Sequence, residues 1–107
     1  MLTLRGPGTV DRTAAILQAD MPDAGVSCEL VTRVDRNGVC LLIYEKYYMR
    51  NSSRASLTVL ISEKDGEVIV DAIASGAGNG SLFNFDFGAA EDFEDTVRRS
   101  LTRNGFS

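Results

Sequence analysis

Hydrophobic and polar residues alternate with two different periods along the chain. Between residues 26 and 75, apolar positions recur at about every second residue in four runs, as in strands with one buried face. Turn-forming residues separate the runs at Asn37-Gly38, Asn51-Ser52-Ser53 and Asp65-Gly66. The pattern predicts four strands, which run approximately over Val26–Val34, Val39–Met49, Ala55–Ser62 and Glu67–Ser75.

Connections this short cannot contain crossover helices, so consecutive strands must pair antiparallel. If Asp65-Gly66 is a two-residue turn, opposite residues of the last hairpin point to the same face. This pairing joins apolar residues only: Leu57 with Ala74, Val59 with Ala72, and Ile61 with Val70. The same reasoning around Asn37-Gly38 predicts the inner residues of the first hairpin: Val26, Cys28, Leu30, Val34, Val39, Leu41 and Ile43. A connection of three or five residues after Met49 then brings the two apolar faces together.

A period of 3.6 residues marks one helix on each side of the strands. Thr9 is a good N-cap for the first helix and Pro22 ends it. The last helix has acidic residues in its first turns and arginines in its last turn, which matches the helix dipole, and Asn104-Gly105 is a typical end signal. The apolar positions of the two helices are Val10, Ala14, Leu17 and Met21, and then Ala90, Phe93, Val97 and Leu101.

These elements predict a single α+β domain over residues 1–107. We expect a two-layer sandwich in the order α-β-β-β-β-α, with the N- and C-terminal helices packed on one face of an antiparallel meander sheet. The sheet has four strands, or five if Leu82–Phe87 adds a short strand before the last helix.

The face of the sheet away from the helices should be polar, but the predicted outer positions are partly apolar. A contiguous apolar centre with a polar rim on a soluble domain usually marks an interface. We therefore expect a homodimer that packs sheet against sheet and buries on the order of 800 Å² per partner. The alternative is scattered exposed apolar residues, which are normal. The predicted interface residues are Leu42, Tyr44, Tyr48, Leu60, Ile69 and Ile73.

Composition limits the chemistry that the chain can perform. The net charge of −4, from 11 basic and 15 acidic residues, argues against binding to nucleic acid or to an anionic membrane. The chain contains no histidine, which is the commonest general base and a common metal ligand. We predict no catalytic residue, no metal site and no cofactor. No apolar run approaches the ~20 residues that cross a membrane, and the first residues do not resemble a signal peptide, so we expect a cytoplasmic location.

The two cysteines are predicted to be reduced. In the expected hairpin Cys28 and Cys40 point to opposite faces and lie five or six residues apart along the strands, at ~3.3 Å per residue. A disulfide needs Cα atoms within roughly 7 Å. An intrachain bridge is therefore excluded in this register.

A glycine-rich loop precedes the last helix. Gly76, Gly78 and Gly80, together with Asn79 and Ser81, allow the backbone to approach a ligand closely. Successive backbone N–H groups in such loops bind phosphate or another small anion. The stretch lacks a third fingerprint glycine, because Ser81 stands in its place, and the alternative is a plain connection between the last strand and the last helix.

Glu45 is a second candidate, since alternation places it on the predicted inner face between Ile43 and Tyr47. A buried carboxylate there would have a raised pKa unless it were paired, and with Tyr47 it would bind a polar ligand. The alternative is a β-bulge that turns Glu45 outward, or a position beyond the helices. Arg50 and Arg54 flank the central turn and are candidates for binding a small anion, against the alternative of solvated charges at a hairpin tip.

Several segments resemble a family of small uncharacterised bacterial proteins known as a domain of unknown function. The resemblance covers nearly the whole chain and implies one domain in a bacterial cytoplasmic protein, with no activity or cofactor to transfer. It is based on Tyr44-Glu45-Lys46-Tyr47-Tyr48-Met49-Arg50, on Ser56-Leu57-Thr58-Val59, on Gly76-Ala77-Gly78, and on Phe87-Gly88-Ala89-Ala90-Glu91-Asp92-Phe93.

Two functions follow from these features. The first is a non-enzymatic binding or interaction module that self-associates through the outer face of the sheet. The alternative is a small-molecule or anion-binding protein, or an enzyme, that uses the loop Gly76–Ser81 together with Glu45.

Overall fold

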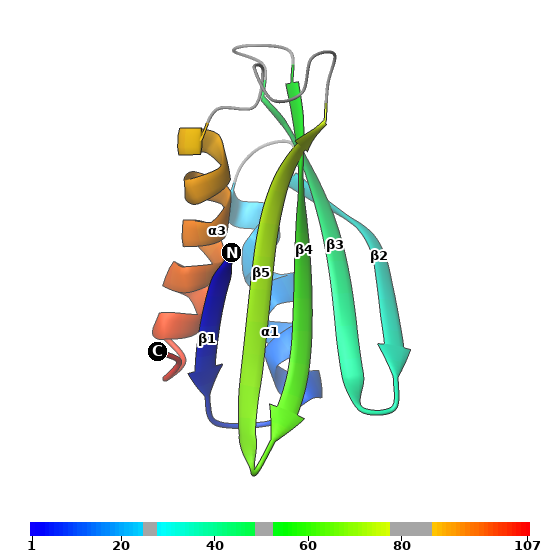
Figure 1. Cartoon of the computed structure of the whole chain (residues 1–107), viewed down its shortest axis with the longest axis vertical. Coiled ribbons are helices and arrows are strands. Elements are labelled where there is room, and N and C mark those ends of the chain that lie inside the picture. Colours follow the sequence, from blue (N-terminus) through cyan, green and yellow to red (C-terminus); the bar gives the residue numbers. More distant parts are fainter. Residues whose placement is uncertain (25–27, 49–52, 78–86) are drawn as a thin grey trace.

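The computed structural model describes residues 1–24, 28–48, 53–77 and 87–107 (Figure 1). Five strands form one antiparallel sheet in the order β1-β5-β4-β3-β2. Helices α1 and α3 contact each other and pack on the same face of this sheet, so the predicted two-layer α+β sandwich is confirmed. The elements are β1 (Leu2–Gly6), α1 (Val10–Asp20), the 3₁₀ helix η1 (Met21–Ala24), β2 (Cys28–Arg36), β3 (Val39–Tyr48), β4 (Ser53–Lys64), β5 (Glu67–Ala77) and α3 (Phe87–Thr102).

The fifth strand is β1, at the start of the chain, and it pairs with β5. Its side chains alternate, because Leu2 and Leu4 are buried and Thr3 is exposed. The expected extra strand at Leu82–Phe87 has no counterpart in the described part, since residues 82–86 lie outside it and Phe87 begins α3. The order is therefore β-α-β-β-β-β-α.

The register predicted for the last hairpin is confirmed. Leu57 pairs with Ala74, Val59 with Ala72 and Ile61 with Val70. Asp65 and Gly66 both have positive φ, at 54° and 78°, as a type I′ turn requires. The inner face of β4 and β5 is consequently the one that the sequence predicts.

The predicted face of β3 is wrong by one residue. Tyr44 pairs with Leu57, and Tyr48 pairs with Ser53, which leaves residues 49–52 as a connection of even length instead of three or five residues. Leu42 and Tyr44 are fully buried under the helices, whereas Leu41 and Ile43 lie on the outer face. Both alternating sets of β3 are apolar, so alternation alone does not decide which set faces the helices.

Strand β2 carries a β-bulge, with a register shift between Leu30 and Thr32. The bulge reverses the alternation along β2, so that Cys28 and Leu30 lie on the inner face, as predicted, while Val34 does not. Val34 pairs with Leu41, as the turn at Asn37-Gly38 predicts, but both residues lie on the outer face. Cys28 and Cys40 are both free. They point to the same inner face, contrary to expectation, but Cys28 pairs with Lys46, six residues beyond Cys40 on β3, or about 20 Å along the strand.

The helices begin and end close to their signals. The Thr9 side chain caps α1 by accepting a hydrogen bond from the Arg12 backbone N–H at 3.1 Å. Helix α3 starts at Phe87, before Ala90, which is the first apolar position predicted for this helix. After the end of α3, Gly105 has a φ of 90°, in the left-handed region that favours glycine. The helices are also linked, since the Ser100 hydroxyl donates to the Asp20 carboxylate at 2.6 Å.

Candidate functional site

The face of the sheet opposite the helices, called the outer face here, carries neighbouring apolar side chains. Val34, Leu41 and Leu60 lie side by side on β2, β3 and β4. In the next row, Ile43 and Ile73 lie on either side of Thr58. Leu60 is 39% exposed and Ile73 46% exposed, and the other three are partly buried. We call Val34, Leu41, Ile43, Leu60 and Ile73 the outer patch.

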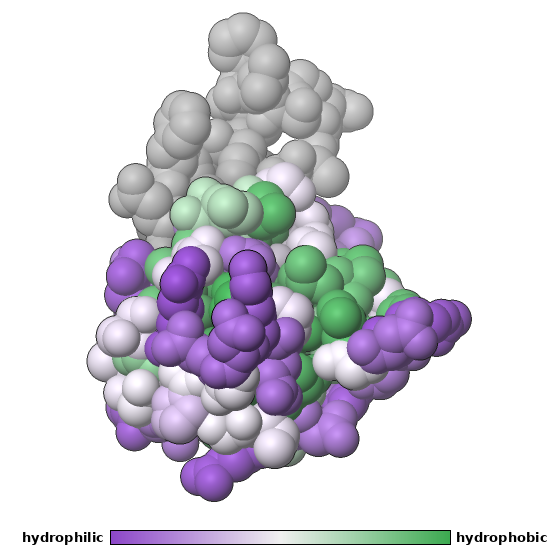
Figure 2. All heavy atoms as spheres, turned by 60° about the horizontal axis from the view of Figure 1, so that its bottom comes forward, coloured by the Kyte–Doolittle hydropathy of each residue, from purple (hydrophilic) through white to green (hydrophobic). Residues whose placement is uncertain are grey.

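Polar residues border the outer patch. One row holds Glu29, Glu45, Ser56 and Ser75 on successive strands, and the hydroxyl groups of Ser56 and Ser75 lie 2.9 Å apart. At the β1 side, the Thr3 hydroxyl donates to the Asp71 carboxylate at 2.7 Å. Figure 2 shows apolar residues gathered between hydrophilic groups on the surface. An apolar centre with a polar border is the typical anatomy of an interface.

The two edges of the sheet are protected. At the β1 edge, Arg5 and Ser107 exchange backbone hydrogen bonds of 3.0 and 2.9 Å, so Ser107 covers the edge of the strand at Arg5. At the β2 edge, the bulge interrupts the ladder, and charged side chains follow it. Bulges and charges on an edge strand discourage pairing with another sheet. The outer face is therefore a more accessible apolar surface than either edge.

Two of the predicted interface residues do not lie on the outer face, and three outer apolar residues were not among those predicted. Leu42 and Tyr44 belong to the core because β3 presents its other set of side chains outward. Leu60, Ile69 and Ile73 do lie on the outer face, and the side chain of Tyr48 lies outside the described part. The sequence analysis missed Val34, Leu41 and Ile43, and only the correct parity of the connection over residues 49–52 would have found them.

The core position of Tyr44 has a chemical consequence. Its hydroxyl group is buried and has no hydrogen-bond partner among the residues that the structure describes. Burial raises the pKa of Tyr44 from 10.0 to about 12. The phenol therefore stays neutral near pH 7, and its inaccessibility argues against acid–base chemistry on a substrate.

The candidate ligand residues are only partly described. Glu45 lies on the outer face, opposite Glu29 and Ser56, as in the alternative that turns it outward and not as alternation places it. The cause is the reversed face of β3 and not a bulge at Glu45. Tyr47, 42% exposed, shares that face and pairs with the exposed Arg54. Gly76 pairs with Ala55 inside β5. The remaining candidates, Arg50, Gly78, Asn79, Gly80 and Ser81, lie outside the described residues.

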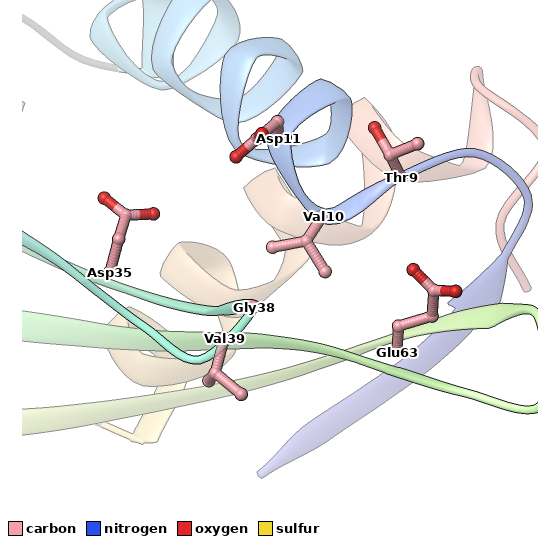
Figure 3. A pocket seen from close by; sticks show the side chains of 7 residues that line it. All are labelled: Thr9, Val10, Asp11, Asp35, Gly38, Val39 and Glu63. Carbon is pink, nitrogen blue, oxygen red and sulfur yellow. The ribbon is translucent and has the colours of Figure 1, made fainter.

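A cleft that the sequence analysis missed lies between the start of α1 and the ends of the hairpins (Figure 3). Its volume is about 380 Å³. Three of its lining residues are acidic: Asp11, Asp35 and Glu63. Within the described ranges, no group of three His, Cys, Asp or Glu residues could hold a metal ion.

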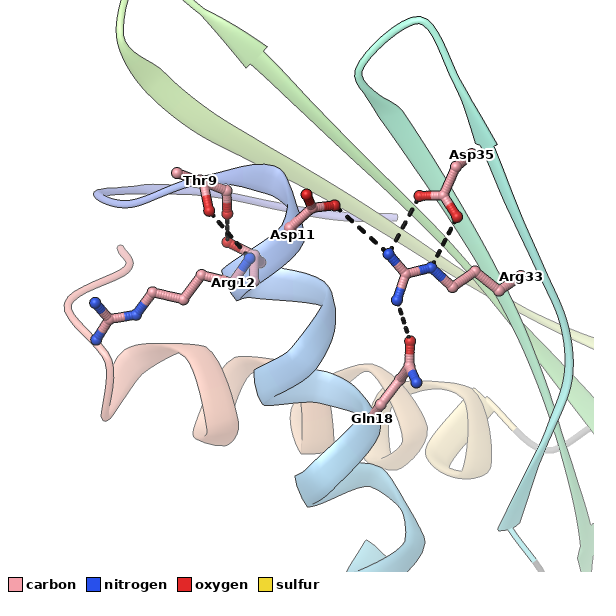
Figure 4. Close-up of polar contacts among 7 residues, drawn as sticks. Thr9, Asp11, Arg12, Gln18, Arg33 and Asp35 are labelled. Atoms are coloured by element: carbon pink, nitrogen blue, oxygen red, sulfur yellow. Dashed lines mark hydrogen bonds and ion pairs between the residues drawn. The ribbon is translucent and has the colours of Figure 1, made fainter.

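Two of these carboxylates are already bound by one arginine (Figure 4). The Arg33 guanidinium donates to both oxygens of Asp35, at 2.9 and 3.2 Å, and lies 3.6 Å from Asp11. It also donates to the Gln18 side chain at 2.6 Å. The hydrogen bonds from Arg33 lower the pKa of Asp35. This cluster connects α1 to β2, so we interpret it as structural.

The fold and surface define a small α+β domain whose sheet is covered by helices on one face and carries an apolar patch on the other. The chain belongs to the family of unknown function DUF6054, whose model matches residues 1–105. This finding confirms the resemblance to a domain of unknown function. No curated protein and no solved structure matches the chain. In the described part of the chain, no helix has the length and apolar character needed to span a membrane.

Proposed function

We propose that this protein is a non-enzymatic interaction module that self-associates through the outer patch. The observation that carries the proposal is the exposure of Leu60 and Ile73 beside Leu41 and Ile43 on one continuous surface. Removing exposed apolar area of this kind from water would stabilise an associated state by roughly 25 cal/mol per Å². Packing against a second outer patch would remove it on both copies at once.

The protection of the sheet edges supports face-to-face packing over edge-to-edge pairing. Arg5 is already paired with Ser107, and the β2 edge is interrupted at its bulge. Two sheets that pack face to face lie ≈ 10 Å apart and interdigitate their side chains. The branched side chains of the outer patch suit this packing, and the small Ser56 and Thr58 do not obstruct it.

The proposal places the module in the cytoplasm of a bacterium, as the sequence resemblance implies. Free thiols persist in reducing compartments, and both cysteines are free. A small anionic ligand bound by the glycine-rich loop was the alternative function. The part of that alternative that needed an inward Glu45 loses its support, because Glu45 lies on the outer face.

The test is sedimentation velocity on the wild-type protein and on Leu60→Lys. We expect a wild-type dimer and a folded Leu60→Lys monomer, because the new charge would be buried in the contact. The matched control is Ala15→Lys, which adds the same charge at an exposed position of α1 on the helix side. A monomeric wild type, or a Leu60→Lys variant that remains dimeric, would contradict the proposal.

A further inference from the structure

The charges around the outer patch point to one arrangement of the two copies. We infer that the dimer has a two-fold axis that crosses the strands at the level of Leu42, so that the strands of the two copies run in opposite directions. In this arrangement Arg36 of each copy lies against Glu29 and Glu45 of the second copy. The inference rests on the proposed self-association and specifies its geometry.

The acidic side of the contact is a pair of like charges. Glu29 and Glu45 lie directly opposite each other on β2 and β3, on the outer face. Neither carboxylate forms a hydrogen bond or an ion pair with another residue that the structure describes. Like charges directly opposite on a sheet destabilise it. A cation from outside the subunit would relieve this repulsion.

The basic side of the contact is at the other end of β2. Arg36 pairs with Val39, which shares the outer face with Leu41 by alternation. The Arg36 side chain is exposed, and one terminal nitrogen donates to the backbone carbonyl of Asp35 at 2.8 Å. A guanidinium has five N–H donors, so donors remain for a carboxylate of a second copy.

The spacing of these groups fits a two-fold axis. Val39 and Glu45 lie three residues before and three residues after Leu42 on β3, or about 10 Å on either side. A two-fold rotation about an axis across the strands at Leu42 therefore brings Arg36 of one copy to the position along the strands that Glu29 and Glu45 occupy in the other copy. The same rotation sets Leu41 against Ile43 of the second copy, which places the outer patch at the centre of the contact.

The other simple arrangement has its axis along the strands, between β3 and β4. It would set Arg36 against Ile69 and the acidic pair against Ser56 and Ser75. The arginine and the two carboxylates would then be covered without an opposite charge, which is costly. Charge complementarity between the charged residues of β2 and β3 thus favours the axis across the strands.

A charge exchange tests the arrangement. Glu29→Arg alone and Arg36→Glu alone should each weaken dimerisation by on the order of tenfold, because each brings like charges together. In an equimolar mixture the reversed charges face each other, so the two variants should form a heterodimer whose Kd is within about threefold of the wild-type value. Sedimentation equilibrium gives the Kd values, and native mass spectrometry identifies the heterodimer by its mass.

The control is Glu63→Arg, which makes the same charge change at an exposed position on the helix side of β4 and should leave the Kd unchanged. Far-UV circular dichroism checks that each variant is folded. If the wild type dimerises and Leu60→Lys abolishes the dimer, but the two charge variants dimerise normally or their mixture shows no recovery, this arrangement is wrong and the proposed self-association stands. A monomeric wild type overturns both.

Discussion

Tyr44 lies directly opposite Leu57 on the neighbouring strand, and both side chains are fully buried beneath the helices. Because side chains alternate along a strand, this pairing fixes the face to which each residue of β3 points. It places Leu42 in the core, turns Leu41, Ile43 and Glu45 to the outer face, and thereby defines the outer patch.

Neighbouring leucines of β3 should respond oppositely to the same substitution. Leu42→Lys puts an unpaired charge into the core and should prevent folding, because the cost of several kcal/mol is comparable to the stability of a small domain. Leu41→Lys changes the outer face and should leave a folded monomer. Circular dichroism and sedimentation velocity distinguish these outcomes. If Leu41→Lys unfolds and Leu42→Lys folds, the face assigned to β3 is wrong.

Tyr44→Phe should stabilise the protein by about 1 kcal/mol. The substitution removes a buried hydroxyl group for which the described part of the chain offers no hydrogen-bond partner, and it leaves the ring in place. Urea unfolding followed by fluorescence or circular dichroism measures the change in the free energy of unfolding. Tyr47→Phe, at an exposed position, is the control and should change it by less than about 0.5 kcal/mol. A clear loss of stability in Tyr44→Phe would mean that the hydroxyl group has a partner.

The same residue predicts a dependence on alkaline pH. The pKa of Tyr44 is raised in the folded state to about 12 from its ordinary value of 10.0, so the folded protein holds the phenolic proton more tightly than the unfolded chain does. The resulting stabilisation is fully present below about pH 10 and decreases as the pH rises toward about 12. The difference in unfolding free energy between wild type and Tyr44→Phe should therefore grow in favour of phenylalanine over this window. A constant difference in urea titrations at several pH values would contradict the raised pKa.

Gly6→Ala should destabilise the protein by about 1–3 kcal/mol. A Cβ atom at Gly6 would meet the ring of Phe106 at 2.5 Å, and Phe106 is itself buried. The displaced ring would loosen the adjacent Ser107, which accepts the Arg5 backbone N–H. Hydrogen exchange at the Arg5 amide should accelerate along with the loss of stability. In a Phe106→Ala background the Gly6→Ala substitution should cost less, and an undiminished cost would show that the ring is not the cause.

The predictability of this fold from sequence differs between its hairpins for physical reasons. In β4 and β5 the inner set is apolar while the outer set contains Thr58, Ser62 and Asp71, so alternation identifies the face without ambiguity. In β3 both sets are apolar at the centre of the strand, and the choice depends on the length of the connection to β4, which sequence does not specify. In β2, the bulge at Val31 changes which face the side chains on either side of it point to. The extra residue leaves no clear signal in the alternation, so the sequence does not reveal the bulge.

The outer patch could be predicted only in part for the same reason. Alternation places Leu60 and Ile73 on the outer face because they belong to the unambiguous hairpin, whereas it assigns Leu41 and Ile43 to the core. Strand β1 was missed although Leu2 and Leu4 alternate with polar residues, because five residues are too few for a reliable period. Its partner β5 is distant in sequence, so no hairpin turn indicates the pairing.

The bonds between Arg5 and Ser107 hold the edge strand β1 at one point. Strand β1 is joined to β5 across a long stretch of sequence, so the entropy of closing that loop makes β1 the least locally supported strand of the sheet. If β1 detaches, Val68, Val70 and Ala72 form an open edge that can recruit a strand from another molecule. The two hydrogen bonds to Ser107 therefore help to keep β1 paired with β5. We expect that weakening these bonds favours amyloid-like assembly under conditions in which the rest of the domain is still folded.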